Sequence, residues 1–207
     1  MIALVDYGMG NLGSVDKALR RVGCEVVVTQ DPGAVRDAAA VVLPGVGAFG
    51  DCMANLKRFG LAQPVTDALT AGKPFLGICL GLQVLFEEGE EAPGVAGLGI
   101  FKGKVERFKH DLKIPHIGWN QIVAPGERPP HLAGVPDGSY VYFVHSYYVV
   151  PEDRSIVATR TDYGYDFVSS VWQGNLFASQ FHPEKSQAVG LQILRSFRDE
   201  VDRLGTG

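Results

Sequence analysis

The sequence has few cysteines, no long apolar run and no excess of basic residues. Its three cysteines, Cys24, Cys52 and Cys79, are odd in number and lack the spacing of metal ligands, so we expect reduced thiols in the cytoplasm and no metal site. The formal net charge of −4 argues against nucleic-acid binding, which requires a basic surface. No apolar run approaches the roughly 18 residues that a transmembrane helix needs, so we expect no membrane association.

The sequence also lacks internal repeats, low-complexity segments and any linker long enough to separate domains. Its 207 residues, of which 46% are hydrophobic and 20% charged, are typical of a soluble globular enzyme with a large core. We therefore predict a single domain over residues 1–207. The N-terminal segment has no basic residue and reaches the acidic residue Asp6 after five positions, so we do not expect a signal peptide.

The first half of the chain alternates between strand and helix patterns. Short apolar or β-branched runs, as in buried parallel strands, occupy residues 2–5, 25–29 and 40–43 and lead up to Cys79. Helical patterns run from Ser14 to a stop at Gly23, over residues 51–59 and over residues 64–71. Residues 31–33, Asp-Pro-Gly, predict a turn. This alternation indicates a doubly wound α/β sheet.

The second half of the chain has a different pattern. After a glycine-rich loop at residues 89–99, short strands are predicted at 104–108, 121–123, 140–145, 156–161, 167–173 and 176–181. Gly174 and Asn175 join the last two strands and predict a hairpin. An amphipathic helix is predicted over residues 189–204. Together the two halves predict an α/β fold with a flavodoxin-like, doubly wound mixed sheet and an antiparallel β extension.

The rest of the chain is organised around the stretch from residue 73 to residue 83. An apolar strand pattern ends in Gly-Ile-Cys-Leu-Gly, and a helical pattern that reaches Phe86 follows. This is the layout of a nucleophile elbow, in which a sharp strand-to-helix turn presents the side chain of Cys79. The positive end of the helix favours the thiolate, and the N–H of Leu80 would face a developing oxyanion. On its own, the stretch is explained equally well by a cysteine buried at a strand end.

A nucleophilic cysteine needs a base and a group that orients the base. Among the five histidines, His182 is the best candidate because it follows a predicted strand and precedes Pro183 and Glu184. The proline favours extended backbone at His182, so side chains 182 and 184 project to the same side. Glu184 can then accept a hydrogen bond from the imidazole. An isolated tripeptide of this kind is better explained as an exposed turn; beside the cysteine motif we prefer the catalytic interpretation.

Two glycine-rich segments follow predicted strands. Pro-Gly-Val-Gly at residues 44–47 can present N–H groups to an oxyanion at the edge where parallel strands end, although an ordinary turn is the alternative. Gly-Met-Gly-Asn-Leu-Gly at residues 8–13, with Asp31 about 20 residues further on, matches the dinucleotide-binding motif. That interpretation leaves Cys79, His182 and Glu184 unexplained, and only one nucleotide-binding half is visible.

Five stretches together resemble the class I glutamine amidotransferase family: residues 6–11, 43–47, 77–83, 118–120 and 180–186. More narrowly, the Pro-Gly-Val-Gly and Gly-Trp-Asn motifs and residues 142–147 are similar to the glutaminase subunits of imidazole glycerol phosphate synthase. The resemblance runs nearly end to end. It implies the fold of that family and no cofactor, so the glycine motif at residues 8–13 would be coincidental.

The resemblance also implies a mechanism. Cys79 would attack the side-chain amide of glutamine, while His182, oriented by Glu184, would pass the proton to the leaving ammonia. The oxyanion would be held by N–H groups of Leu80 and of one residue among Gly45, Val46 and Gly47. The glutamine-binding positions would be Gly47, Gln83, Ser146 and Tyr147, of which Gln83 lies one helical turn past the nucleophile.

Members of the family deliver their ammonia to a (β/α)8-barrel cyclase subunit, which forms imidazole glycerol phosphate and AICAR in histidine biosynthesis. The resemblance therefore implies a heterodimer. Positions that match the contact with this subunit are Asn11, Trp119, Tyr142 and Lys185, although the aromatic residues among them are equally suited to a core. Because Gly45 and Gly47 flank Val46, that peptide can rotate at low steric cost, and we predict that docking of the partner turns one N–H toward the oxyanion.

Three alternatives remain open. The chain fits a glutaminase that serves a different synthase, and its glycine motif fits a dinucleotide- or flavin-binding module. A cysteine hydrolase of the α/β-hydrolase type is disfavoured, because its acid should precede the histidine at a distance rather than follow it by two residues.

Overall fold

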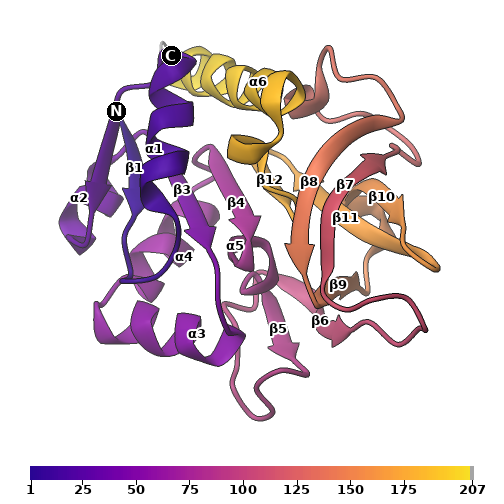
Figure 1. Cartoon of the computed structure of the whole chain (residues 1–207). Coiled ribbons are helices and arrows are strands. Elements are labelled where there is room, and N and C mark those ends of the chain that lie inside the picture. Colours follow the sequence, from indigo (N-terminus) through magenta and orange to yellow (C-terminus); the bar gives the residue numbers. More distant parts are fainter. Residues whose placement is uncertain (206–207) are drawn as a thin grey trace.

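The computed structural model describes residues 1–205 and has an α/β fold built on a ten-stranded mixed sheet (Figure 1). The strand order is β2-β1-β3-β4-β12-β11-β9-β6-β5, with β10 paired to β11, and β7 and β8 form a separate two-stranded sheet. The predicted fold class, a doubly wound sheet with an antiparallel extension, is confirmed. No helix among residues 1–205 is long and apolar enough to cross a membrane.

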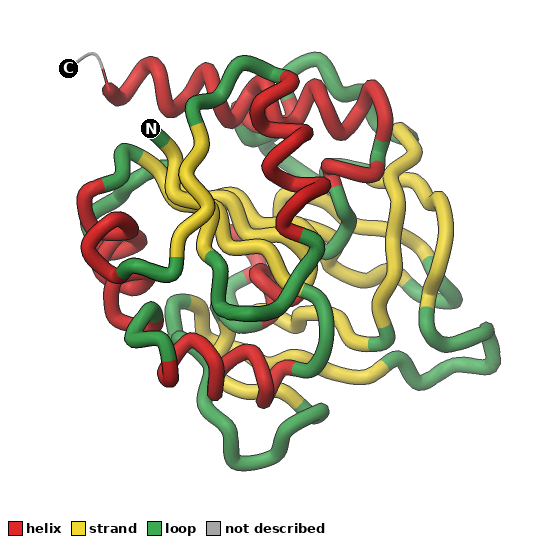
Figure 2. Tube along the Cα trace, turned by 60° about the vertical axis from the view of Figure 1, so that its left-hand side comes forward, coloured by secondary structure: helices red, strands yellow, loops and turns green. Residues whose placement is uncertain are grey.

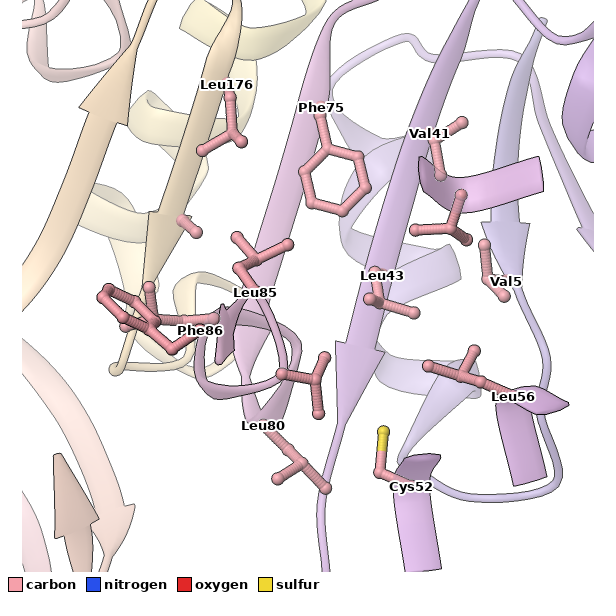
Figure 3. Packing of buried hydrophobic residues seen from close by; sticks show 14 of the residues in the cluster. Val5, Val41, Leu43, Cys52, Leu56, Phe75, Leu80, Leu85, Phe86 and Leu176 are labelled. Carbon is pink, nitrogen blue, oxygen red and sulfur yellow. The ribbon is translucent and has the colours of Figure 1, made fainter. Parts of the chain in front are cut away.

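One half of the sheet is parallel. It consists of β1 (Ile2–Val5), β2 (Val26–Thr29), β3 (Ala40–Gly45), β4 (Phe75–Cys79) and β12 (Leu176–Ser179). Successive side chains alternate between the two faces, so that Val5 and Leu43 join one buried cluster (Figure 3) while Leu4 and Val42 join another. Both faces are apolar because helices cover both.

Helices cover the two faces of this parallel half (Figures 1 and 2). One face carries α2 (Pro32–Asp37), α3 (Phe49–Arg58) and α4 (Ala62–Thr70), and the other carries α1 (Leu12–Arg21) and α6 (Gln187–Gly205). In Figure 3, Cys52 and Leu56 of α3 lie against the face that contains Leu43. The short helix α5 (Leu80–Gln83) directly follows β4.

The other half of the sheet is mostly antiparallel. It contains β5 (Phe86–Gly89), β6 (Phe101–Arg107), β9 (Tyr147–Pro151), β10 (Val157–Asp162) and β11 (Asp166–Gln173). The hairpin predicted at residues 174–175 joins β11 to β12. The separate sheet pairs β7 (His116–Ile122) with β8 (Ser139–His145), and three short 3-10 helices cover Pro130–Leu132, Arg154–Ile156 and Pro183–Lys185.

The helix predicted after the cysteine motif is wrong in length. Helix α5 ends at Gln83, and Phe86, which we expected to be helical, begins strand β5. The N–H of Leu98 donates to the carbonyl of Val84 at 2.7 Å. The Val84 carbonyl, which would accept a hydrogen bond within a longer helix, therefore accepts one from the glycine-rich loop instead.

Other element bounds also differ from the predictions. The predicted turn at residues 31–33 is the start of helix α2, because the side chain of Asp31 caps it by accepting the N–H of Gly33 at 2.8 Å. Helix α1 is capped by Asn11 rather than opened by Ser14. Strand β9 was not predicted, and β7 extends well before the predicted residues 121–123. In β7 the aromatic residue Trp119 is exposed, and in β9 both Tyr147 and Tyr148 are half-buried, so neither sequence shows the apolar–polar alternation of a strand.

Candidate active site

Cys79 is held in a strained turn at the end of β4. Its backbone has φ 56° and ψ −106°, a combination that a residue with a Cβ rarely adopts. The flanking glycines allow this turn, since a Cβ on Gly77 would lie 2.8 Å from that of Ala178, and one on Gly81 would collide with the carbonyl of Leu43. The motif therefore folds as the sharp strand-to-helix elbow that the sequence predicts.

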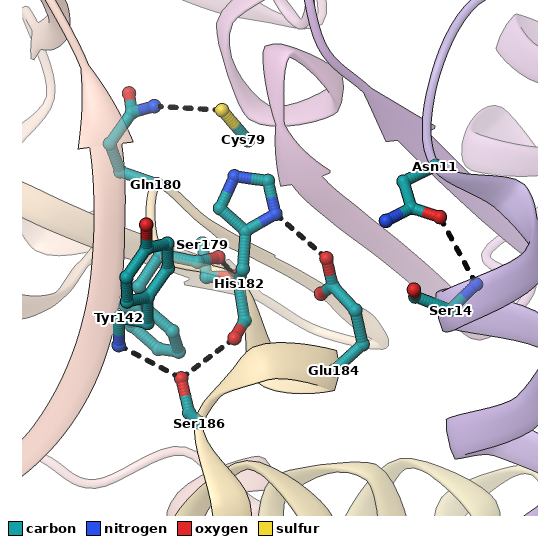
Figure 4. Close-up of polar contacts among 10 residues, drawn as sticks. Asn11, Ser14, Cys79, Tyr142, Ser179, Gln180, His182, Glu184 and Ser186 are labelled. Carbon is teal, nitrogen blue, oxygen red and sulfur yellow. Dashed lines mark hydrogen bonds and ion pairs between the residues drawn. The ribbon is translucent and has the colours of Figure 1, made fainter. Parts of the chain in front are cut away.

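His182 and Glu184 form a buried pair beyond the end of β12. The Nδ1–H of His182 donates to Oε1 of Glu184 at 2.8 Å, and both side chains are 2% exposed. His182 has extended backbone, as the following proline predicts. Its Nε2 is buried without a hydrogen-bond partner among residues 1–205 and points toward the sulfur of Cys79 (Figure 4). The three side chains are thus arranged in the order nucleophile, imidazole, carboxylate.

The surroundings of His182 act on its charge in opposite directions. Burial alone would lower its pKa, but interactions with the sulfur of Cys79 and the carboxylate of Glu184 outweigh burial and raise the pKa to about 10. The proton is therefore held on the imidazole at neutral pH. A protonated imidazole beside the sulfur is the arrangement that activates a cysteine nucleophile.

Two glutamine side chains connect the nucleophile to the antiparallel half of the molecule. The Nε2 of Gln180 donates to the sulfur of Cys79 at 3.5 Å (Figure 4), and its Oε1 accepts from Nε2 of Gln83 at 3.0 Å. Gln83 also donates to the carbonyl of Tyr147 at 3.2 Å. Gln83 was predicted as a site residue, whereas Gln180 was missed because only its place in a motif, two residues before His182, signals a role.

A cavity of about 420 Å³ opens over Cys79. Most of the residues predicted to hold glutamine or the oxyanion line it, together with residues that the sequence did not suggest. The predicted ones are Val46, Gly47, Leu80, Gln83, Ser146 and Tyr147, and the others are Glu91, Pro115, Val144 and His145. Lys185, predicted at the partner contact, also lines the cavity, but Gly45 does not.

Gly45 lies at a crowded position at the end of β3. It pairs with Cys79 across β3 and β4, and a Cβ added to it would collide with the hydroxyl of Tyr7 and lie 2.8 Å from the Cβ of Leu80. The Tyr7 hydroxyl donates to the carbonyl of Pro44 at 2.8 Å. Glycine is needed here for close approach, so rotational freedom begins only beyond Gly45.

Gly47 and Val46 are less constrained. Gly47 has φ 105°, in the region that favours glycine, and Val46 is 38% exposed. Any rotation of this segment is therefore confined to the peptides after Gly45.

Of the residues predicted to contact a partner, Trp119 lies on β7 and Tyr142 on β8 of the separate sheet, whereas Lys185 ends the 3-10 helix that follows His182. Trp119 is 45% exposed and packs edge-on against Tyr142, with the ring centroids 6.1 Å apart. The Nζ of Lys185 lies 5.6 Å from the centre of the Tyr142 ring. Ile117 and Tyr140 of the same sheet are also exposed. We call the exposed face that carries these aromatic residues the β7–β8 face.

Asn11 and the neighbouring glycines build the start of helix α1. The side chain of Asn11 accepts the N–H of Ser14 at 3.3 Å (Figure 4), and Gly8 and Gly10 both have positive φ. Local turn geometry thus accounts for the glycine motif at residues 8–13. Among residues 1–205, no group of three or more His, Cys, Asp or Glu side chains is arranged to hold a metal ion.

The family model described as "Glutamine amidotransferase class-I" matches residues 3–200. The chain therefore belongs to the class I glutamine amidotransferase family and is an enzyme of that class, as its motifs predict. The narrower resemblance, to the glutaminase subunit of imidazole glycerol phosphate synthase, is confirmed by curated relatives.

Among the curated relatives, "Imidazole glycerol phosphate synthase subunit HisH" from Syntrophotalea carbinolica is 54% identical over 96% of this chain and 100% of its own length. The protein of the same name from Aquifex aeolicus is 53% identical over 98% of both chains. Solved structures share the fold at low identity. A "glutamine amidotransferase" superimposes with a TM-score of 0.76 at 20% identity, covering 98% of this chain and 100% of the other. The structure of "PurLQS from Thermotoga maritima" gives 0.75 at 21% identity, covering 96% and 97%.

Proposed function

We propose that this protein hydrolyses glutamine with Cys79, His182 and Glu184 and supplies the ammonia to a cyclase subunit, as the glutaminase subunit of imidazole glycerol phosphate synthase in histidine biosynthesis. The observation that carries the proposal is the strained cysteine at the elbow beside a buried histidine–glutamate pair. The name of the relatives at about half identity supports the choice of synthase.

In the first half of the reaction, the Cys79 thiolate attacks the side-chain carbonyl carbon of glutamine and forms a tetrahedral oxyanion. His182 gives its Nε2 proton to the amide nitrogen, the C–N bond breaks, and ammonia leaves a glutamyl thioester. In the second half, the neutral His182 takes a proton from water, and the hydroxide attacks the thioester. The C–S bond breaks, glutamate leaves, and the thiolate and the protonated imidazole are restored.

Glu184 does not carry the proton in this scheme. Its hydrogen bond to Nδ1 fixes the ring so that Nε2 faces the sulfur, and its charge stabilises the protonated imidazole. The N–H of Leu80 and an N–H from the segment of Val46 and Gly47 hold the oxyanion. Gly45, which the sequence also suggested for this role, supports the segment through its close contact with Leu80.

Glutamine binds in the cavity over Cys79, between Gly47 and Gln83 on one side and the backbone of Ser146 and Tyr147 on the other. The volume of about 420 Å³ is sufficient for one amino acid and its water. The Gln83 side chain is held by two hydrogen bonds, so it is in place before substrate arrives.

The β7–β8 face, with Trp119 and Tyr142, is the docking surface for the barrel cyclase, and Lys185 lies against it over the Tyr142 ring. Asn11, at the start of α1, is the fourth contact position. Exposed aromatic side chains are enriched at protein interfaces. The three cysteines are free thiols in the structure, which fits a reducing compartment, the cytoplasm.

The test is reconstitution with a barrel cyclase subunit. We expect the two chains to copurify, and the complex to form imidazole glycerol phosphate with glutamine as the nitrogen source, whereas the cyclase alone requires free ammonia. Release of ammonia from glutamine without copurification would assign the chain to a different synthase. Absence of glutamine hydrolysis in the reconstituted complex would refute the proposal.

A further inference from the structure

We propose that His116 and His145 are positioning residues of the glutamine site, which hold the carbonyl of Tyr147 through a directed chain of hydrogen bonds that starts at Asn120. The proposal rests on the proposed function, since it assigns these residues to the wall that binds glutamine. His116 begins β7 and His145 ends β8, and the two residues are paired in register, so their imidazoles meet at the end of the separate sheet where His145 lines the cavity.

The chain of hydrogen bonds is continuous. Asn120 Nδ2 lies 3.3 Å from His116 Nε2, and His116 Nδ1 lies 3.0 Å from His145 Nε2. His145 Nδ1 lies 2.8 Å from the carbonyl oxygen of Tyr147. Asn120 is itself held by a second bond, from Nδ2 to the carbonyl of Asp162 at 2.8 Å.

The partners at the two ends fix the direction of every bond. The Tyr147 carbonyl can only accept, so Nδ1 of His145 carries the proton and its Nε2 must accept from Nδ1–H of His116. Nε2 of His116 then accepts from the amide of Asn120, which can only donate. With both rings neutral, both imidazoles are therefore Nδ1–H tautomers. Burial lowers the pKa of His116 to about 4 and that of His145 to about 3, which keeps both rings neutral at physiological pH.

The chain ends on the wall of the cavity. The Tyr147 carbonyl accepts two hydrogen bonds, from His145 and from Gln83, which occupy both of its lone pairs. The second amide hydrogen of Gln83 goes to Gln180, which in turn donates to the sulfur of Cys79. Loss of the His145 bond would free the Tyr147 peptide and, through it, the side chain of Gln83.

Packing alone does not explain the two histidines. His116 stacks on Phe143 and Tyr163, with centroid distances of 4.8 and 4.0 Å, and phenylalanine would fill such a place. His110 provides the comparison within the same aromatic cluster. Its ring lies 5.1 Å from that of Tyr163, yet both of its nitrogens are buried without a hydrogen-bond partner among residues 1–205.

The first test is steady-state glutaminase kinetics of the complex with saturating cyclase subunit. His145→Phe keeps a ring but removes both nitrogens, and we expect it to raise the glutamine KM roughly ten-fold, the effect of losing a buried hydrogen bond. His145→Asn keeps a donor near the position of Nδ1, and we expect it to change KM by less than about three-fold. In both variants kcat should change less than KM, because Cys79, His182 and Glu184 keep their contacts.

His110→Phe is the matched control, since it removes an imidazole from the same aromatic cluster outside the chain of hydrogen bonds, and it should leave KM unchanged. Equal KM values for His145→Phe and His145→Asn would overturn the proposal. If His145→Phe fails to fold, His116→Asn replaces it in the series. That variant keeps a donor to His145 but loses the acceptor for Asn120, so its KM should exceed that of the wild type by less than the roughly ten-fold expected for His145→Phe, and a KM equal to that of the wild type would overturn the proposal.

The second test does not depend on activity. Nitrogen-15 NMR of the wild-type protein at pH 7 should find both imidazoles neutral with the proton on Nδ1, with assignments from the His116→Asn and His145→Asn spectra. A proton on Nε2 of either ring would overturn the proposal. Because this measurement needs no glutamine, it tests the direction of the hydrogen bonds separately from the proposed function, which fails only if the wild-type complex does not hydrolyse glutamine.

Discussion

The two sides of the active-site cavity are built in different ways. On the parallel side, Cys79 ends strand β4 and His182 follows the neighbouring strand β12. The backbone conformation at each residue determines the direction of its side chain. On the antiparallel side, Ser146 and Tyr147 contribute backbone groups whose orientation depends on side chains from β7, β8 and α5. Local backbone geometry therefore positions the side chains of Cys79 and His182. Hydrogen bonds from side chains of other elements, α5 and β8, position the backbone of Tyr147. Each side can be disturbed separately.

The largest effect is expected from Cys79→Ala, which removes the nucleophile from the parallel side. Ammonia release from glutamine should fall roughly 10³-fold or more. The substitution is small and keeps the elbow, so binding of the cyclase subunit, measured by calorimetry, should not change. Residual glutaminase activity above a few per cent of the wild type would show that Cys79 is not the nucleophile.

The next largest effect is expected from a rotation of the segment of Val46 and Gly47 when the cyclase subunit binds. We expect kcat for glutamine hydrolysis to rise roughly 10²–10³-fold when the cyclase subunit and its own substrate are added, the effect of gaining one oxyanion donor. KM should change less, because Gln83 is already in place. Full activity of the isolated chain, or activation confined to KM, would contradict a rotation of this segment.

A smaller loss is expected from Glu184→Gln than from His182→Ala. The amide still accepts a hydrogen bond from Nδ1, but it no longer stabilises the protonated imidazole, and we expect kcat to fall roughly 10²-fold, against 10³-fold or more for His182→Ala. Single-turnover assays of thioester formation measure this directly. A Glu184→Gln enzyme as active as the wild type would remove the carboxylate from the catalytic group.

Trp119→Ala tests the β7–β8 face of the antiparallel side. Loss of a large, 45% exposed aromatic side chain at the centre of an interface should weaken the affinity for the cyclase subunit roughly 30-fold. The matched control is Val28→Ala, since Val28 is 42% exposed on β2, away from that face. Equal affinities of the two variants, measured by surface plasmon resonance, would place the interface elsewhere.

The smallest effect is expected in the pH dependence of stability, to which His145 on the antiparallel side and His182 on the parallel side contribute in opposite pH ranges. Burial lowers the pKa of His145 to about 3, so the unfolded chain binds a proton that the folded chain does not. The free energy of unfolding therefore falls as pH drops from about 6.5 toward 3, by at most about 1.4 kcal/mol per pH unit. The pKa of His182 is raised, so its contribution is present below about 6.5 and is lost as pH rises toward 10.

Urea unfolding at a series of pH values measures both slopes. We expect His145→Asn to reduce the slope of the free energy of unfolding against pH below pH 6.5, and His182→Asn to reduce that slope above pH 6.5. A wild-type profile with the same slope on both sides of pH 6.5, or variants with unchanged slopes, would contradict this assignment of the charges.

The sequence predicted the parallel side well because its signals are local. Glycines at fixed distances from Cys79, and a proline after His182, act on the backbone of their own neighbours, and the structure places these residues as expected. The close packing around Gly45 was not predicted from the sequence. The crowding by the Tyr7 hydroxyl involves a residue 38 positions away, and no local pattern reports such a contact.

The antiparallel side was predicted poorly because the residues that contact each other there are far apart in the sequence. His116 and His145 were taken for ordinary residues at the ends of short segments, and only the register of β7 against β8 brings their rings together. Strand β9 was missed because its two half-buried tyrosines show no strand alternation. Helix α5 was extended too far because the buried apolar residues 84–86 that follow it fit a helix as well as a strand.

The backbone of Cys79 has a consequence for how such an enzyme can evolve or be engineered. A residue with a Cβ held at φ 56° costs roughly 1–3 kcal/mol, against a net stability of about 5–15 kcal/mol for a typical domain. Glycine at position 79 would relieve that strain and remove the thiol in the same step. If Cys79 is the nucleophile that we propose, selection for heat resistance alone would favour inactive sequences at this position, and only selection for glutamine hydrolysis would retain the cysteine.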